Sequence, residues 1–577
     1  MANPQAAERR IAIIGAGFSG LCLGIQLKRA GIHSFTIFEK AAQLGGTWRD
    51  NTYPGAACDV PAFAYCFSFE QGTNWSRKWA PQSEILAYME HCARKHRLLP
   101  HIRFDTEIAG ARFDAEQGRW TLRTTAGEEI AADVLVSATG QLNRPVVPRL
   151  PGLDRFRGKS FHSARWDHTY DLTGRTVAVV GNAASAIQFI PQIAPVVRQL
   201  HVFQRSANWM VPRGDRAYTE REKRRFARHR LLARLYRWWI WLQYEMQWPL
   251  FRRNRFAARH VTRRAADNLS AHVADPRTRD VLTPDYPIGG KRILISDDYY
   301  QALGRRNVEL VTSGIDGFTE AAVVTRDGQT RPVDAVILAT GFDSTSFLAP
   351  MEIEGLNGRS LHAEWRHGAR AFLGITVAGF PNLFLTYGPN TNLGHNSIIF
   401  MIECQVRYII DCIEQLVARD LKYMDLRHDV METYNARLQE ELRATVWATT
   451  DRSWYKTADG TITNNWSGST IRYWWRTRRA DLGCYTVVPC LSGALTEFRP
   501  HALGGGDVVG HEMTPHIEGR FVEERKQGIT AATAATRIGA WPGDQDDRLV
   551  LLGGERNQLG GFEQRDGANA DPLGDGP

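Results

Sequence analysis

Short apolar runs separated by turn residues recur through the first 340 residues. Residues 11–14 and 35–38 are such runs, and the stretch between them is typical of a tight turn followed by a helix. The same order of strand, turn and helix opens again at residues 176–180. Two further apolar runs, 134–136 and 336–338, lead into the tripeptide Ala-Thr-Gly. Strands that alternate with helices in this way predict an α/β fold with parallel sheets.

The pattern changes in two places. Residues 213–264 are predicted to be helical, with Pro249 as a break, and they combine many arginines with several tryptophans. From about Leu491 periodic apolar runs become rare, and the sequence turns glycine-rich and acidic. We expect residues 491–577 to be a mostly disordered tail.

Composition narrows the class of protein. With 577 residues, 43% of them hydrophobic and 10% aromatic, the chain has enough material for several domains. It opens without a charged-then-apolar leader and contains no apolar run of membrane-spanning length. Its eight cysteines include no C-x-x-C pair. These features favour a reduced, cytoplasmic protein without a zinc or other metal site.

The net charge of +9 draws attention to residues 213–264. Basic residues beside tryptophans suit an anionic membrane surface or a nucleic acid. We favour a helical insertion whose aromatic face packs inward and whose arginines face solvent. Peripheral membrane contact is the main alternative, and no nucleic-acid partner is expected.

The first turn, Gly15-Ala16-Gly17-Phe18-Ser19-Gly20, has the spacing of a dinucleotide-binding turn between a strand and a helix. Gly15 permits the turn, Gly17 lets the backbone approach a pyrophosphate, and Gly20 lets the helix pack on the sheet. Glu39 follows about 20 residues later, where a carboxylate accepts hydrogen bonds from ribose hydroxyls. The segment therefore predicts a tightly bound dinucleotide.

The second turn, Gly181-Asn182-Ala183-Ala184-Ser185-Ala186, departs from this pattern. Alanine is accepted at the third glycine position, but the methyl group of Ala183 points into the space that a pyrophosphate approaches. The next strand ends in Arg205 and Ser206 rather than in an acid, and a cation suits the 2′-phosphate of NADPH. A solvated surface arginine is the alternative.

Two longer strings carry the most specific signal. Residues 156–167 fit F-x-G-x-x-x-H-x-x-x-W-[P/D], and residues 46–59 fit G-x-W-x-x-x-x-[F/Y]-P-G-x-x-x-D, both at every fixed position. These strings resemble motifs of the Baeyer–Villiger monooxygenases, a branch of the flavin-containing monooxygenases. The fixed positions of the first string, the fingerprint, are Phe156, Gly158, His162, Trp166 and Asp167.

The resemblance implies two Rossmann-like domains. An FAD-binding domain would be split into residues 8–145 and 336–490, the second part also forming the substrate pocket. An NADP-binding domain would occupy residues 146–335, with a helical insertion at about 213–283. Segments 452–455 and 465–469 would shape the pocket together with the loop 394–396, in which His395 is expected to be a packed histidine rather than a proton donor.

The resemblance also implies the reaction. NADPH reduces FAD, the reduced flavin forms a C4a-peroxide with O₂, and one oxygen atom is inserted next to a ketone carbonyl to give an ester or lactone. A flavin monooxygenase that oxygenates nitrogen or sulfur is the close alternative. A non-enzymatic protein that binds membranes or nucleic acid is the distant one. We expect a monomer or a homodimer.

The resemblance assigns site residues by position. Arg292 would stabilise anionic oxygen during the reaction, and Asp59 would orient it through a bidentate pair. Lys291 would contact the 2′-phosphate. The residues expected to contact the two cofactors are Gly15, Gly17, Phe18, Ser19, Gly20, Glu39, Lys40, Gly46, Thr47, Trp48, Asp59, Tyr65, Gly181, Asn182, Ala183, Ser185, Ala186, Arg205, Ser206, Lys291, Thr340 and Gly341.

Overall fold

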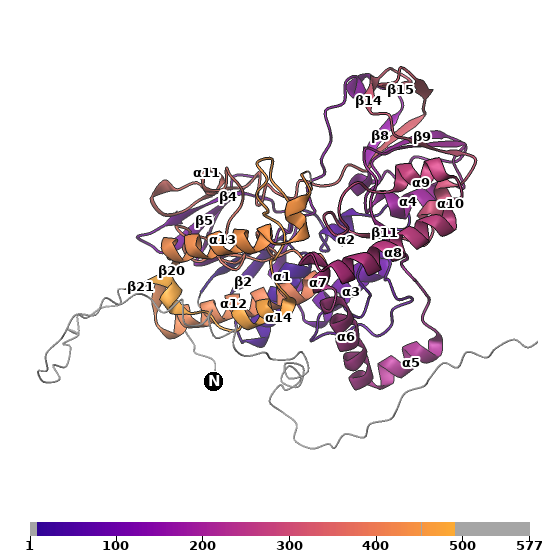
Figure 1. The fold of residues 1–577 in the computed structure, drawn as a ribbon. Coiled ribbons are helices and arrows are strands. Elements are labelled where there is room, and N and C mark those ends of the chain that lie inside the picture. Colours follow the sequence, from indigo (N-terminus) through magenta and orange to yellow (C-terminus); the bar gives the residue numbers. More distant parts are fainter. Residues whose placement is uncertain (1–8, 452, 491–577) are drawn as a thin grey trace, which may run out of the picture. The chain divides into compact units, whose positions relative to one another are not determined.

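A computed structural model describes residues 9–451 and 453–490 (Figure 1). The predicted tail, residues 491–577, lies outside the described part of the chain. The fold is α/β and contains two five-stranded parallel sheets, which confirms the predicted fold class.

The first sheet has the strand order β19-β7-β1-β2-β3. Its strands are β1 (Ile11–Ile14), β2 (Phe35–Phe38), β3 (Ile102–Arg103), β7 (Val134–Ser137) and β19 (Leu383–Leu385). Every residue of β1, β7 and β19 is buried. Helices cover both faces of a parallel sheet, so its strands are apolar throughout rather than alternating.

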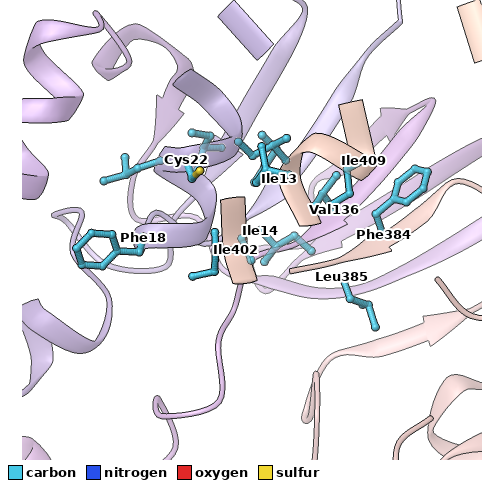
Figure 2. Close-up of a cluster of buried hydrophobic side chains, with 14 of the residues drawn as sticks. Ile13, Ile14, Phe18, Cys22, Val136, Phe384, Leu385, Ile402 and Ile409 are labelled. Carbon is cyan, nitrogen blue, oxygen red and sulfur yellow. The ribbon is translucent and has the colours of Figure 1, made fainter. Parts of the chain in front are cut away.

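One core holds this sheet together. Helix α1 (Phe18–Arg29) connects β1 to β2 and packs against α12 (Ile398–Ala418). Figure 2 shows Ile13 and Val136 from the strands gathered with Cys22 of α1 and Ile409 of α12. The C-terminal part of the described chain thus shares a core with the N-terminal part.

The second sheet has the strand order β13-β10-β9-β17-β8. Its strands are β8 (Lys159–His162), β9 (Thr176–Val180), β10 (Gln199–Phe203), β13 (Val308–Val311) and β17 (Ala335–Leu338). Helix α4 (Ala186–Ile193) follows β9 and packs against α10 (Tyr299–Leu303). Apolar side chains of α4 and the central strands form a separate buried cluster.

The predicted helical insertion lies between two short strands, β11 (Met210–Val211) and β12 (Leu294–Ile295), which pair in parallel. Its helices are α5 (Glu220–Arg228), α6 (Arg230–Glu245), α7 (Trp248–Phe251), α8 (Arg255–His272) and α9 (Pro276–Leu282). The helix breaks after Glu245, slightly earlier than predicted, and Pro249 is the second residue of the short α7. Because β11 and β12 pair, the two ends of the insertion meet, and the segment just before β12 is held in place.

The remaining elements complete the two halves. The remaining strands are β4 (Ile108–Asp114), β5 (Arg119–Thr124), β6 (Glu129–Ala132), β14 (Ile315–Phe318), β15 (Ala322–Thr325), β16 (Thr330–Pro332), β18 (Glu352–Glu354), β20 (Leu421–Leu426) and β21 (Tyr485–Pro489). The remaining α-helices are α2 (Thr47–Asp50), α3 (Gln82–Lys95), α11 (Leu361–Glu364), α13 (His428–Arg443) and α14 (Thr470–Arg476). Within the described residues, no helix has the length and apolarity that crossing a membrane requires.

Candidate active site

A cavity of about 1520 Å³ lies at the carboxyl ends of strands from both parallel sheets. This is the edge at which ligands bind in open α/β sheets. Of the residues expected to contact the cofactors, all line the cavity except Gly20 and Ala186. Those two lie in buried positions on α1 and α4, where they serve packing.

The first turn borders an open space beside Gly17 that no described atom fills. A Cβ atom at Gly15 would lie 2.7 Å from the Ala138 carbonyl oxygen, and one at Gly20 would lie 2.0 Å from the Gly15 carbonyl oxygen. A Cβ atom at Gly17 would meet no described atom within 4 Å. Gly17 also begins α1 without a side-chain cap, so backbone N–H groups of the first helical turn are available to an anion. The turn fits a pyrophosphate.

Glu39 is more tightly engaged than the sequence indicates. Its carboxylate is buried and accepts hydrogen bonds from the Ala16 and Ala41 amides at 2.9 and 3.1 Å. Arg49 Nη1 forms an ion pair with it at 2.8 Å. Glu39 therefore fixes the glycine turn to the end of β2, and only part of its acceptor capacity remains for a ribose.

The second turn has the same geometry with one difference. Gly181 adopts φ +110°, and a Cβ atom there would lie 2.5 Å from the Ala339 carbonyl oxygen, which repeats the relation of Gly15 to Ala138. In both sheets, the residue that lies against the turn glycine is thus the alanine of an Ala-Thr-Gly tripeptide: Ala138 after β7 and Ala339 after β17. Ala183, at the position of the second glycine, is exposed and lines the cavity. Its methyl group therefore borders the cavity, where a ligand would lie, and does not disturb the packing of the protein.

Cations gather beside the second turn. Lys291 Nζ donates to Ser206 Oγ at 3.3 Å and lies over the Tyr286 ring. Burial lowers the pKa of Lys291, and the nearby positive charge of Arg205 acts in the same direction. Arg205 itself is exposed to the cavity. Lys291, which is distant in sequence from Arg205 and Ser206, thus joins them in one positively charged cluster whose chemistry suits an anion.

The segment 45–59 closes the cavity between the two sheets. Gln188 of α4 accepts from the Ala57 amide and donates to the Ala57 carbonyl oxygen, at 3.2 and 3.1 Å. A Cβ atom at Gly55 would lie 2.7 Å from the Gln188 carbonyl oxygen, so the segment approaches α4 closely. Arg213, at the start of the insertion, donates to the Cys58 carbonyl oxygen at 3.1 Å. The residues just before Asp59 are thereby held by α4 on one side and by Arg213 on the other.

Arg292 pairs with Asp59 inside this cavity. The guanidinium donates to Asp59 Oδ2 through Nε at 2.9 Å and also through Nη2. The expected bidentate pair is therefore wrong in detail, because both nitrogens contact one oxygen. The Asp59 carboxylate raises the pKa of Arg292, although burial acts in the opposite direction. Each side chain is 31% exposed, and both line the cavity, so the pair faces the cavity interior.

Two tyrosines lie near this pair: Tyr455, from the segment 452–455 that was expected to shape the pocket, and Tyr387, which was not among the expected site residues. Tyr387 lines the cavity with φ +53°, and its hydroxyl donates to Asn392 Oδ1 at 2.9 Å. Burial raises the pKa of Tyr455 to about 12, so its hydroxyl stays protonated near neutral pH. The local signal that could have identified Tyr387 is its place before Gly388-Pro389-Asn390, in a turn after β19.

The fingerprint residues do not line the cavity. Phe156 packs against Phe318, and a Cβ atom at Gly158 would lie 2.6 Å from the Asp334 carbonyl oxygen. His162 is buried at the end of edge strand β8, and burial lowers its pKa. Trp166 packs between the rings of Phe161 and Phe189, while Asp167 pairs with Lys159.

The fingerprint thus packs β8 and the turn after it onto the rest of the second sheet and onto α4, outside the cavity lining.

His395 is a packed histidine, as expected. It lies between the rings of Trp248 and Phe251, and its Nε2 is 3.5 Å from Glu245 Oε2. Glu245 also accepts from Thr470 Oγ1 at 2.6 Å and from Asn396 Nδ2 at 3.0 Å. Burial opposes ionisation, but these hydrogen bonds and His395 hold the pKa of Glu245 below its ordinary value. This buried cluster fixes α6 to the loop before α12.

Comparison with known proteins agrees with this geometry. Residues 8–222 match the model of the family described as flavin-binding monooxygenase-like. A Baeyer–Villiger monooxygenase of Streptomyces coelicolor is 44% identical over 484 residues, which cover 83% of this chain and 92% of that protein. The chain belongs to the Baeyer–Villiger monooxygenases.

Solved structures of this family superpose on most of the chain. An oxidized steroid monooxygenase bound to NADP has a TM-score of 0.74 and 32% identity, with 83% of this chain and 99% of that chain covered. A complex of OTEMO with FAD and NADP has a TM-score of 0.73 and 25% identity, with 82% and 97% covered. The predicted family and enzyme class are confirmed.

Proposed function

We propose that the protein is an FAD- and NADPH-dependent Baeyer–Villiger monooxygenase that converts ketones to esters or lactones with O₂. The observation that carries the proposal is the Arg292–Asp59 pair, which faces a cavity lined by both nucleotide-type turns. We further propose a cytoplasmic monomer or homodimer without a nucleic-acid partner. The FAD-binding domain would comprise residues 8–145 and 336–490, and the NADP-binding domain residues 146–335.

The chemistry of the two turns suits these cofactors. The open space at Gly17 and the uncapped start of α1 would receive the FAD pyrophosphate. Arg205, Lys291 and Ser206 would receive the 2′-phosphate of NADPH. When bound, the flavin accepts hydride from NADPH and activates O₂ for transfer to the substrate. The protein binds, orients and supplies charge.

Arg292 would act on the charge that oxygen transfer creates. Attack on a ketone carbonyl places negative charge on the carbonyl oxygen, and a positioned cation in a water-poor cavity stabilises such charge strongly. Asp59 keeps Arg292 in one place, because two nitrogens of the Arg292 guanidinium donate to the same oxygen of the Asp59 carboxylate. Asp59 is in turn fixed through its neighbour Cys58, whose carbonyl oxygen accepts from Arg213.

A substrate panel tests the reaction class. The FAD-loaded protein would be given NADPH, O₂ and cyclic, linear and aryl ketones, with sulfides and amines as a parallel set, and products would be analysed by mass spectrometry. The proposal expects esters or lactones that contain one atom from labelled O₂. Formation of sulfoxides or N-oxides without any ester would instead assign the protein to the heteroatom-oxygenating flavin monooxygenases.

A further inference from the structure

Helix α6 of the insertion carries large apolar side chains on its exposed face as well as on the face that it buries. Leu231, Leu235 and Trp239 are 69%, 56% and 50% exposed, and their spacing places them in one stripe. Met246, which follows the last residue of α6, continues this stripe at 65% exposed. Large apolar side chains that lie together on the outer face of a helix indicate an interaction surface.

The opposite face of α6 explains why the stripe points outward. Arg237 lies inside, where its Nη1 donates to the carbonyl oxygens of Phe63 and Cys66 at 2.9 and 2.7 Å. Glu245 forms the buried cluster with Thr470 and Asn396. These polar contacts fix the orientation of α6, so the exposed stripe is built into the fold.

Unpaired cations surround the stripe. Helices α5 and α6 pack against each other (Figure 1). Five exposed arginines on these two helices make no ion pair with any described residue: Arg221, Arg225 and Arg228 on α5, and Arg230 and Arg234 on α6. The acids near the start of α5 are already engaged, since Glu220 pairs with Lys223 and Glu222 with Arg216.

We propose that this surface, the α6 stripe with the five arginines, docks on an anionic phospholipid bilayer. Interfacial helices combine leucine and tryptophan, which enter the acyl boundary, with arginines that contact anionic headgroups. A second copy of the chain fits less well, because a twofold contact between two such surfaces brings like charges together. A nucleic acid would meet the arginines but leaves leucine and methionine in water.

Vesicle flotation of the full-length, FAD-loaded protein tests the proposal. The probes are vesicles of phosphatidylcholine and vesicles of phosphatidylcholine with phosphatidylglycerol. The test variants are Leu235→Gln/Trp239→Gln and Arg230→Gln/Arg234→Gln. The matched controls are Val196→Gln/Trp475→Gln and Arg305→Gln/Arg306→Gln, which change an aliphatic residue with a tryptophan, and two arginines, at exposed positions elsewhere.

We expect binding to the anionic vesicles only, and weaker binding at high salt. Each test variant should weaken that binding by about tenfold or more, while the controls bind as the wild type does and all five proteins keep their flavin. Absence of wild-type binding to anionic vesicles would overturn the proposal, as would test variants that bind normally. A wild-type dimer in light scattering that Leu235→Gln/Trp239→Gln dissociates would assign the surface to a second copy.

Discussion

At the scale of single residues, the glycines of the first turn are of two kinds. Gly15 and Gly20 are required by the packing of the protein itself, whereas Gly17 leaves room for a ligand. Gly15 and Gly20 have no room for a Cβ atom because backbone oxygens lie within 2.7 and 2.0 Å. Gly17 has room among the described atoms and an ordinary φ of −81°. This difference makes Gly17 a clean probe of the cofactor site.

Gly17→Val should yield folded protein that lacks FAD, because the valine side chain enters space that only the pyrophosphate uses. Flavin absorbance of the purified protein measures the loss, and the melting temperature should match that of wild-type protein stripped of flavin. Gly20→Ala is the control, since it should lower the melting temperature of the flavin-free protein as well. A full flavin complement in Gly17→Val contradicts the assignment of this turn.

Arg205→Ala should raise the Michaelis constant for NADPH by roughly 10- to 150-fold, the effect of losing one charge-assisted contact of about 1.5–3 kcal/mol. The constant for NADH should change little, because NADH lacks the 2′-phosphate. Arg306→Ala, an exposed arginine outside the cavity, serves as the control. Equal losses with both nucleotides would remove Arg205 from the phosphate site.

Sequence reasoning was strongest where chemistry is local. The residues of the two turns that were expected to contact the cofactors, apart from Gly20 and Ala186, line one cavity together with Arg205 and Lys291. The engagement of Glu39 was missed because its partner Arg49 lies in the short helix α2, whose position the local pattern does not determine. The fingerprint carries the family signal, yet its residues lie outside the cavity lining, so a diagnostic string need not contain site residues.

At the scale of secondary-structure elements, α6 shows where a periodic pattern is insufficient. The sequence predicts its aromatic face inward and its arginines outward, which holds for Tyr236 and Arg234. Trp239 is exposed, however, and Arg237 donates to buried carbonyl oxygens. Those acceptors are 174 and 171 residues away in sequence. A helix pattern gives the angle between two side chains and does not say which side meets the core.

Strand β20 provides a pH test. Asp425 accepts from the Gly379 amide at 2.9 Å, and burial raises its pKa from 3.8 to about 6. A raised folded-state pKa stabilises the fold fully below pH 3.8, and this contribution is lost as the pH rises through about 6. Ionised Asp425 then costs at most about 3 kcal/mol.

Asp425→Asn keeps an acceptor but does not titrate. Its melting temperature relative to wild type should therefore rise between pH 5 and pH 7, where the raised pKa of about 6 falls, and level off above. Asp154→Asn, at an exposed position, should show no such trend. A difference that stays constant over this range would contradict the raised pKa of Asp425.

At the scale of the whole molecule, two sheets with repeated turns place their carboxyl ends around one cavity. The alternation of strands and helices predicts both parallel sheets, and the paired relation of Gly15 to Ala138 and Gly181 to Ala339 follows from the repeated Ala-Thr-Gly. The pairing of Arg292 with Asp59, 233 residues apart, came from the family resemblance alone. It depends on the pairing of β11 with β12, and strands of only two residues cannot be recognised in a sequence.

The product yield of Arg292→Ala tests the proposed reaction most directly. The variant should bind FAD and still oxidise NADPH, while ester formation falls by about 10²-fold or more, the scale for removing one positioned charge. Consumed O₂ should then be released as hydrogen peroxide. Arg292→Lys keeps the charge but cannot direct two nitrogens at Asp59, so it should recover only part of the yield. Ester formation by Arg292→Ala at the wild-type rate would contradict the assigned role of this residue.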